Sequence, residues 1–116
     1  MNPQIKTRWI TALLSGKYKQ GKEVLRRKNN TFCCLGVLCD LYIKENGGEW
    51  KMRKNDEGSY SIMRNNTRLP RIIQRWAGIN STEGSYYSDD DETLANDNDS
   101  GGKGFKTIAK IIEKYF

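Results

Sequence analysis

Histidine is absent from the 116-residue chain, and its absence removes several kinds of chemistry at once. Histidine is the side chain that most often serves as a base near neutral pH and as a metal ligand. Without it, no Ser-His or Cys-His nucleophilic pair can form within the chain. The three cysteines also lack the two-by-two spacing of a zinc site. We therefore expect no catalytic residue, no metal and no cofactor.

Cysteine is scarce and confined to one short segment, at Cys33, Cys34 and Cys39. On the helix expected there, adjacent residues and residues five or six apart make poor disulfide partners. The sequence therefore predicts free, buried thiols and a reducing compartment, the cytoplasm. Cys33 and Cys34 also lie near the start of that helix, where an exposed thiol would have a lowered pKa.

Long apolar runs are missing as well. No stretch approaches the roughly 18 consecutive apolar residues of a membrane helix. Residues 1–15 carry charges at Lys6 and Arg8, where a signal peptide would be apolar. The sequence predicts neither a membrane span nor a secretion signal.

The residues that are present fit one small α+β domain over residues 1–116. Asn2 followed by Pro3 is a typical helix start, and apolar residues then recur at helical spacing as far as Gly16. Residues 31–45 are apolar on almost every face, which predicts a central helix buried all round. Gly36 within that helix indicates the close approach of another backbone.

Two further helices and a hairpin are predicted downstream. Residues 50–53 and 59–64 flank a glycine-closed turn, which favours a short β-hairpin or a small antiparallel sheet. Residues 105–116 have one clear apolar face. Another helix is expected to end at Gly78, with an apolar face formed by Leu69, Ile72, Ile73 and Trp76.

Two segments have no clear helical or strand pattern. Residues 79–104 are rich in Ser, Asn, Asp and Gly, which predicts a long, acidic, mobile loop. Residues 18–28 fit a strand, a helix or a loop equally well.

Charge is unevenly distributed along the chain, whose net charge is +6. Residues 1–30 carry eight Lys or Arg against one acid, Glu23, whereas residues 76–102 carry seven acids and no base. We therefore expect one part of the molecule to attract anions and another to repel them.

The basic segment is the first candidate binding surface. Cations beside aromatic rings suit a phosphorylated small molecule, with the rings stacked on a base. A continuous basic track would suit a nucleic-acid backbone instead. An ordinary solvated face is the third interpretation. The candidate ligand-binding residues are Arg8, Trp9, Lys17, Tyr18, Lys22, Arg26 and Arg27.

Two loop motifs fall short of known sites. Counted from Asp97, a calcium-binding loop would need glutamate at position twelve, where the chain has Ile108. The glycines in residues 101–104 precede a helix but lack the full spacing of a phosphate-binding loop. The acidic segment instead supplies the alternative partner-binding residues: Asp89, Asp90, Asp91, Glu92, Asp97 and Asp99.

A family resemblance rests on two main segments: Trp9…Leu13-Leu14-Ser15-Gly16-Lys17-Tyr18-Lys19-Gln20 and Phe32-Cys33-Cys34-Leu35-Gly36-Val37-Leu38-Cys39-Asp40. Three shorter matches follow: Leu69-Pro70…Trp76, Asn96-Asp97 and Phe105…Ile108-Ala109. Together they resemble a family of small, mostly uncharacterised bacteriophage and prophage proteins that share an aromatic-CCLGVLCD motif. The chain departs from that pattern at residues 98–103, which are inserted around a short Asp-Gly turn.

The resemblance implies a phage accessory protein that acts in the host cytoplasm by binding, not as an enzyme, and antagonises bacterial immunity. The first expectation is that it sequesters a nucleotide-derived immune signal on basic residues near the first helix. The second is inhibition of a host defence protein, with the acidic residues imitating nucleic acid. The third is a small nucleic-acid-binding regulator. Proteins that sequester such signals often form symmetric homo-oligomers, so an oligomer is expected here.

Overall fold

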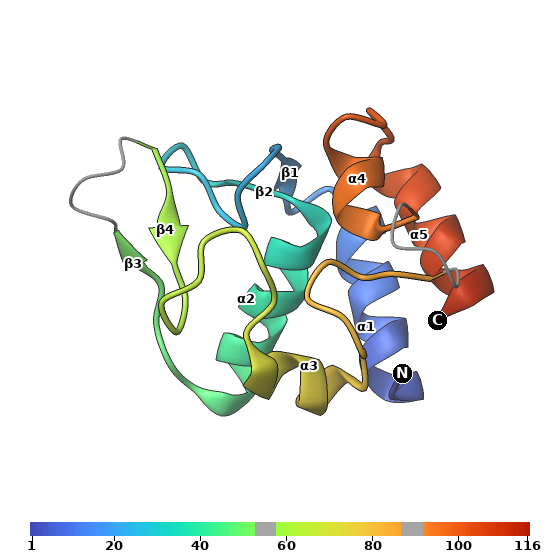
Figure 1. Ribbon diagram of the computed structural model, residues 1–116, viewed down its shortest axis with the longest axis horizontal. Helices are drawn as coiled ribbons and strands as arrows, with labels where there is room; N and C mark the ends of the chain where they lie inside the picture. Colours follow the sequence, from blue (N-terminus) through green and yellow to red (C-terminus); the bar gives the residue numbers. More distant parts are fainter. Residues whose placement is uncertain (53–57, 87–91) are drawn as a thin grey trace.

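Helix α2 (Cys34–Asn46) lies in the middle of the molecule, between two small sheets and the helix pair α1 (Pro3–Leu14) and α5 (Phe105–Tyr115) (Figure 1). The short helices α3 (Arg71–Ala77) and α4 (Leu94–Asn98) lie toward opposite ends of this arrangement (Figure 1). The structure, a computed structural model, describes residues 1–52, 58–86 and 92–116. Its helices and sheets confirm the α+β class.

Each sheet is a pair of two-residue strands. β1 (Lys19–Gln20) and β2 (Thr31–Phe32) are parallel, whereas β3 (Lys51–Met52) and β4 (Tyr60–Ser61) are antiparallel. The antiparallel pair confirms the predicted hairpin, although residues 53–57 of its turn lie outside the described residues. The parallel pair was not predicted.

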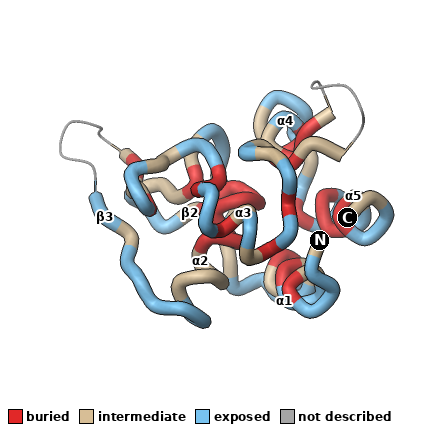
Figure 2. Tube along the Cα trace, turned by 60° about the horizontal axis from the view of Figure 1, so that its bottom comes forward, coloured by how far each residue is buried: buried red, intermediate tan, exposed pale blue. Residues whose placement is uncertain are grey.

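The α1–α5 pair follows the sequence pattern closely. The Asn2 side chain accepts hydrogen bonds from the backbone N–H groups of Gln4 and Ile5, at 2.9 and 3.0 Å, and so caps α1. The inner faces of α1 and α5 are buried and contribute to one hydrophobic core with α2, α3 and α4 (Figure 2). Within the described residues, no helix combines the length and apolar character needed to cross a bilayer.

The central helix begins later than predicted. Thr31 and Phe32 pair with β1, and the Cys33 side chain caps α2 by accepting a hydrogen bond from Gly36 N at 3.4 Å. Residues 34–39 are fully buried, but residues 40–43 are only partly buried and residues 44–46 are exposed. Burial on every face therefore holds for the first half of α2 alone.

The Cys-Cys-Leu-Gly segment is held by tertiary contacts. A Cβ at Gly36 would collide with the Leu25 carbonyl, so the predicted close backbone approach is confirmed. Trp9 Nε1 donates a hydrogen bond to the Cys34 carbonyl at 3.0 Å, which ties α1 to the start of α2. The most distinctive motif of the chain therefore specifies packing.

Asn98, at the end of α4, has a fully buried side chain that makes four hydrogen bonds. Its Oδ1 accepts from Cys34 N at 3.1 Å and from Gln20 Nε2 at 2.9 Å. Its Nδ2 donates to the Gly21 carbonyl at 2.8 Å and to Asp99 Oδ1 at 2.9 Å. One amide thus joins α4 to α2 and to the segment after β1.

The prediction of a long loop over residues 79–104 is wrong in part. Residues 94–98 form α4, whose N-terminal cap is Thr93, with the side-chain oxygen accepting from Asn96 N at 3.0 Å. Leu94 is fully buried in the core. Residues 87–91 of this segment lie outside the described residues.

Helix α3 forms where the sequence predicts it, but its apolar face is turned relative to the prediction. Leu69, Ile73 and Ala77 are buried, whereas Ile72 is 54% exposed. Trp76 is partly buried, and its ring packs on Tyr42 of α2.

Candidate functional site

Three of the predicted ligand-binding residues lie together. Arg8, Lys17 and Tyr18 line a groove of about 310 Å³ between α1 and α2, to which Lys44 of α2 also contributes. Lys44 was not among the predicted ligand-binding residues because it lies outside the basic segment.

Most of the positive charge in this groove is already paired. Arg8 forms a salt bridge with Glu45 at 3.2 Å. Lys44 Nζ donates to the Tyr18 hydroxyl at 3.0 Å, and Tyr18 donates to Asp40 at 2.5 Å. Burial and the hydrogen bond to Asp40 raise the pKa of Tyr18, and the hydrogen bond to Tyr18 raises the pKa of Lys44. Lys17 alone offers the groove an unpaired charge within the described residues.

The other predicted ligand residues do not join this groove. Trp9 is fully buried, so its predicted role of stacking on a ligand is wrong. The Arg26 guanidinium lies over three aromatic rings, 4.4 Å from the ring centre of Tyr60 at the closest. Arg27 pairs with Glu23 at 3.4 Å, and Lys22 is exposed.

The acidic partner surface is only partly described, because Asp89, Asp90 and Asp91 lie outside the described residues. Asp97 is buried and accepts from Tyr86 at 2.6 Å and from Lys103 at 2.7 Å. Asp99 accepts from the backbone N–H of Glu23 at 2.9 Å.

The described acids of this segment are engaged by neighbouring side chains and backbone groups. Burial and the hydrogen bond to Asp97 raise the pKa of Tyr86, and the hydrogen bond to Asp97 raises the pKa of Lys103. Glu92 is partly buried and accepts from the Tyr86 hydroxyl at 3.3 Å. Asp97 therefore supports the fold and is not free to meet a partner.

The thiols lie inside the core, as predicted. Burial raises the pKa of Cys33 to about 12 and holds those of Cys34 and Cys39 well above the ordinary value. A thiol nucleophile needs an exposed, low-pKa sulfur, so the capping position of Cys33 does not make it reactive. The described residues also contain no cluster of three or more Cys, Asp or Glu arranged to hold a metal.

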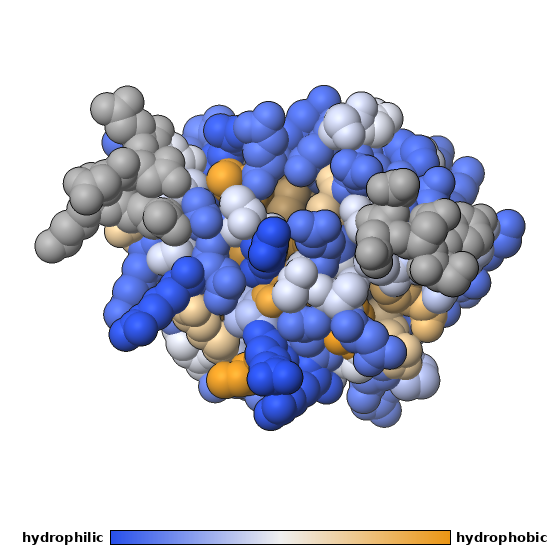
Figure 3. All heavy atoms as spheres, viewed as in Figure 1, coloured by the Kyte–Doolittle hydropathy of each residue, from blue (hydrophilic) through white to orange (hydrophobic). Residues whose placement is uncertain are grey.

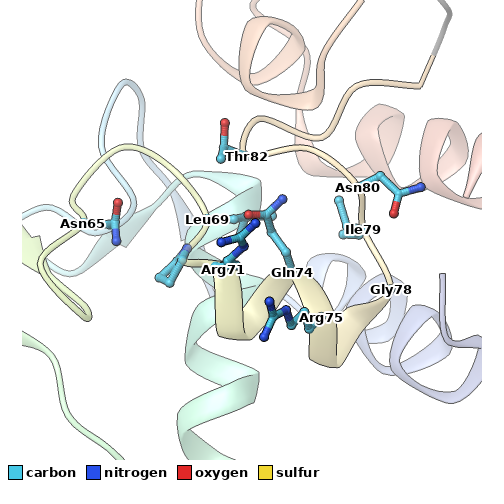
Figure 4. Close-up of a pocket in the computed structure, with 10 residues that line it drawn as sticks. Asn65, Leu69, Arg71, Gln74, Arg75, Gly78, Ile79, Asn80 and Thr82 are labelled. Atoms are coloured by element: carbon cyan, nitrogen blue, oxygen red, sulfur yellow. The ribbon is translucent and has the colours of Figure 1, made fainter.

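A larger pocket, which the sequence analysis did not identify, lies between α3 and the chain that follows it (Figure 4). Its volume is about 740 Å³, within the usual range for small-molecule sites. We call it the α3 pocket; its lining residues are Asn65, Leu69, Pro70, Arg71, Gln74, Arg75, Gly78, Ile79, Asn80 and Thr82.

Backbone hydrogen bonds hold the α3 pocket at both ends. At one end, Gly78 takes a left-handed conformation, with φ of 74°, that turns the chain back along the helix. The N–H groups of Gly78 and Ile79 both donate to the Gln74 carbonyl, at 2.8 and 2.9 Å. At the other end, Leu69 N donates to the Thr82 carbonyl at 2.9 Å. These backbone hydrogen bonds fix the chain after α3 against the helix, and so fix the two walls of the pocket.

The α3 pocket is positively charged. Arg71 and Arg75 are four residues apart on α3, and neither forms a salt bridge or hydrogen bond through its side chain within the described residues. Among the described residues, no carboxylate lines the pocket, and Glu83, next to Thr82, pairs with Arg68 at 3.7 Å. The surface over α3 is mostly hydrophilic (Figure 3).

The remaining polar groups of the α3 pocket complement these cations. Figure 4 shows the side chains of Arg71 and Gln74 pointing from α3 toward the loop that carries Thr82, with Asn65 and Asn80 at the two sides. Guanidinium, amide and hydroxyl groups bind anions and polyols well, and none is a general acid or base at neutral pH. The arrangement is suited to binding.

A sequence signal for this pocket existed. Arg71 and Arg75 occupy i and i+4 positions of a predicted helix, and no acid lies three or four residues from either one. Like charges at this spacing destabilise a helix, so an unpaired pair suggests a function. What the sequence did not indicate was that residues 79–82 fold back to form the opposite wall.

Comparisons with known proteins give one result. No curated protein and no solved structure matches the chain. A family described as Domain of unknown function (DUF8296) matches residues 1–116. The chain therefore belongs to the DUF8296 family over its whole given length.

Proposed function

We propose that this protein binds a phosphorylated small molecule in the α3 pocket. The observation that carries the proposal is the pair Arg71 and Arg75, two arginines of one pocket for which the described part of the chain supplies neither a counter-charge nor a lining carboxylate. An arginine binds phosphate through two parallel hydrogen bonds, and such charge-assisted bonds are about twice as strong as neutral ones.

A bound phosphate would also relieve a cost that the free protein carries. Like charges at i and i+4 destabilise a helix by about 0.2–0.5 kcal/mol. A phosphate bound at this pair adds an attraction to the positive charges and so offsets that repulsion. The protein is then expected to be more stable with the ligand than without it.

The biological role is the one that the phage resemblance suggests. A protein that binds a phosphorylated ligand and lacks catalytic groups can act by sequestering it. In this proposal the ligand is a nucleotide-derived signal of bacterial immunity, and the protein acts in the host cytoplasm as a non-enzymatic antagonist. We therefore place the ligand site at α3 and not at the predicted basic segment. Arg71 and Arg75 on α3 have no acidic partner among the described residues, whereas most cations of the groove between α1 and α2 are paired.

Thermal melting with a panel of probes tests the proposal. The panel contains inorganic phosphate, pyrophosphate, cyclic mono- and dinucleotides, and ADP-ribose. A probe present at 100 times its Kd is expected to add about 2.7 kcal/mol to the free energy of unfolding. The double variant Arg71→Gln/Arg75→Gln is expected to lose this stabilisation and to keep its far-UV circular dichroism spectrum.

A matched control removes the same charge elsewhere. Lys110 and Lys114 are also exposed and four residues apart, on α5. Lys110→Gln/Lys114→Gln is expected to respond to the probes like the wild type. Absence of any shift in the wild type, or an equal shift in both double variants, would contradict the proposal.

A further inference from the structure

We infer that the α3 pocket recognises the phosphorylated sugar of its ligand and leaves any nucleobase outside. The inference rests on the proposed function, because it takes Arg71 and Arg75 as the phosphate-binding groups. It goes further by naming the part of the ligand that the other lining residues contact.

The first argument is that no aromatic side chain lines the pocket among the described residues. Proteins commonly hold bases by stacking them on aromatic rings. The aromatic residue of α3 is Trp76, and it is engaged elsewhere. Its Nε1 donates to Glu45 at 2.8 Å, and its ring lies 5.2 Å from that of Tyr42 on α2. The described part of the pocket therefore offers no aromatic ring on which a base could stack.

The pocket also contains side-chain hydrogen-bond acceptors. Arginine only donates hydrogen bonds, so a ligand hydroxyl that donates needs another partner. Gln74, Asn80 and Thr82 supply amide and hydroxyl oxygens as well as donors. Within the part of the chain that the structure describes, none of these three side chains hydrogen-bonds to the protein. A polyhydroxylated ring next to a phosphate matches this set.

Apolar residues also belong to the pocket lining, although they expose little surface. They are Leu69, Pro70 and Ile79, all of them buried. A sugar ring has a small C–H face and a rim of hydroxyls, so its face can use this narrow apolar surface while its rim meets the amides. A planar base would need a wider apolar surface to replace the water it loses.

Isothermal titration calorimetry with three simple probes tests the inference. The probes are inorganic phosphate, ribose 5-phosphate and adenosine 5′-monophosphate. Ribose 5-phosphate is expected to bind about tenfold more tightly than phosphate, which corresponds to one or two added hydrogen bonds. Adenosine 5′-monophosphate is expected to bind within about threefold of ribose 5-phosphate, because the base gains no contact.

Variants separate sugar recognition from phosphate recognition. Gln74→Met/Asn80→Ala is expected to bring the affinities for ribose 5-phosphate and phosphate within about threefold of each other, because the sugar loses its partners. Asn46→Ala, which alters an exposed amide on α2, is expected to leave both affinities as they are.

The outcomes distinguish the two claims. Equal binding of phosphate and ribose 5-phosphate by the wild type would overturn the sugar inference and leave the proposed function standing. Much tighter binding of adenosine 5′-monophosphate would also overturn it, because the base would then be recognised. If none of the three probes binds, the sugar inference fails, and the proposed function fails with it only if the melting panel also gives no shift.

Discussion

At the scale of single residues, Gly36 is the glycine whose replacement would bring a Cβ into the closest contact with another atom. The Leu25 carbonyl occupies the position that a Cβ would take. Because both groups are backbone on packed segments, neither can move cheaply. We expect Gly36→Ala to lower the free energy of unfolding by about 3 kcal/mol, at the upper end of overpacking effects, as measured by urea denaturation. Gly58→Ala is the control, since nothing lies within 4 Å of the position that its new methyl group would take; equal losses in the two variants would contradict this steric explanation.

The buried thiols make the free energy of unfolding depend on pH in the alkaline range. Burial raises the pKa of Cys33 from 9.0 to about 12 and keeps those of Cys34 and Cys39 well above 9.0. At a pH above the thiol pKa of the unfolded chain, the unfolded chain loses these protons and the folded chain keeps them, so the free energy of unfolding falls as pH rises. The contribution of the thiols to stability is fully present below the unfolded pKa and is lost as pH rises toward each folded pKa.

Urea denaturation under reducing conditions measures this dependence. Each thiol is expected to account for about 1 kcal/mol of the loss in the free energy of unfolding between about pH 9 and 10. Cys39→Ala removes one of the three groups, so its loss over this interval is expected to be smaller by that amount. An identical pH dependence in the variant and the wild type would show that the thiol of Cys39 ionises equally in both states.

Some of these residue roles were predictable, and others needed the fold. The burial of the thiols and the close approach at Gly36 follow from an apolar, glycine-containing helix. Trp9 was assigned to a ligand because aromatic residues near cations suit nucleotides, and only the packing of α1 against α2 shows that its ring is buried. Arg71 and Arg75 become a site only because residues 79–82 return along α3.

At the scale of elements, the start of α1 depends on one side chain. Asn2 Oδ1 accepts from two backbone N–H groups of the first turn. We expect Asn2→Ala to lower the free energy of unfolding by about 1 kcal/mol, because those groups lose their partner. Asn2→Asp keeps the acceptor and should be close to the wild type in thermal or urea denaturation. A large loss in Asn2→Asp would mean that the Asn2 amide nitrogen, and not the cap, matters.

The elements that the sequence predicts are those with a repeating pattern. α1 and α5 are long enough for an apolar face to recur several times, and the hairpin has a glycine-closed turn. α4 has only five residues, too few for a period, and depends on the tertiary hydrogen bonds of Asn98. β1 and β2 are likewise two-residue strands formed by pairing, so residues 18–28 gave no local pattern to identify.

At the scale of the whole molecule, folding brings part of the acidic segment against part of the basic segment, within the residues that the structure describes. The acidic segment after residue 92 packs on the basic segment after β1. Asn98 bonds to Gln20 and Gly21, and Asp99 accepts from Glu23 N. Two segments that differ in sign therefore lie side by side, and the anion site arises on α3, outside both of them.

The arrangement of the core leads to a prediction for the unfolding of the whole chain. Buried residues from all five helices of the described structure belong to one hydrophobic cluster. We therefore expect residues 1–116 to unfold as one domain, with tryptophan fluorescence and far-UV circular dichroism giving coincident urea transitions. Ile112→Ala, at a fully buried position of α5, should shift both transitions together by about 2–5 kcal/mol, the usual size for core truncations.

Ile72 provides the matched control, since it is also an isoleucine on a helix but is 54% exposed. Ile72→Ala is expected to change the free energy of unfolding by less than about 0.5 kcal/mol. If Ile112→Ala separated the two transitions, so that fluorescence and circular dichroism no longer coincided, α1 and α5, with Trp9 between them, would form a unit that unfolds separately from the α2–α3 region, where Trp76 packs on Tyr42. The single-domain prediction would then be wrong, because one cooperative core cannot lose stability in only part of its length.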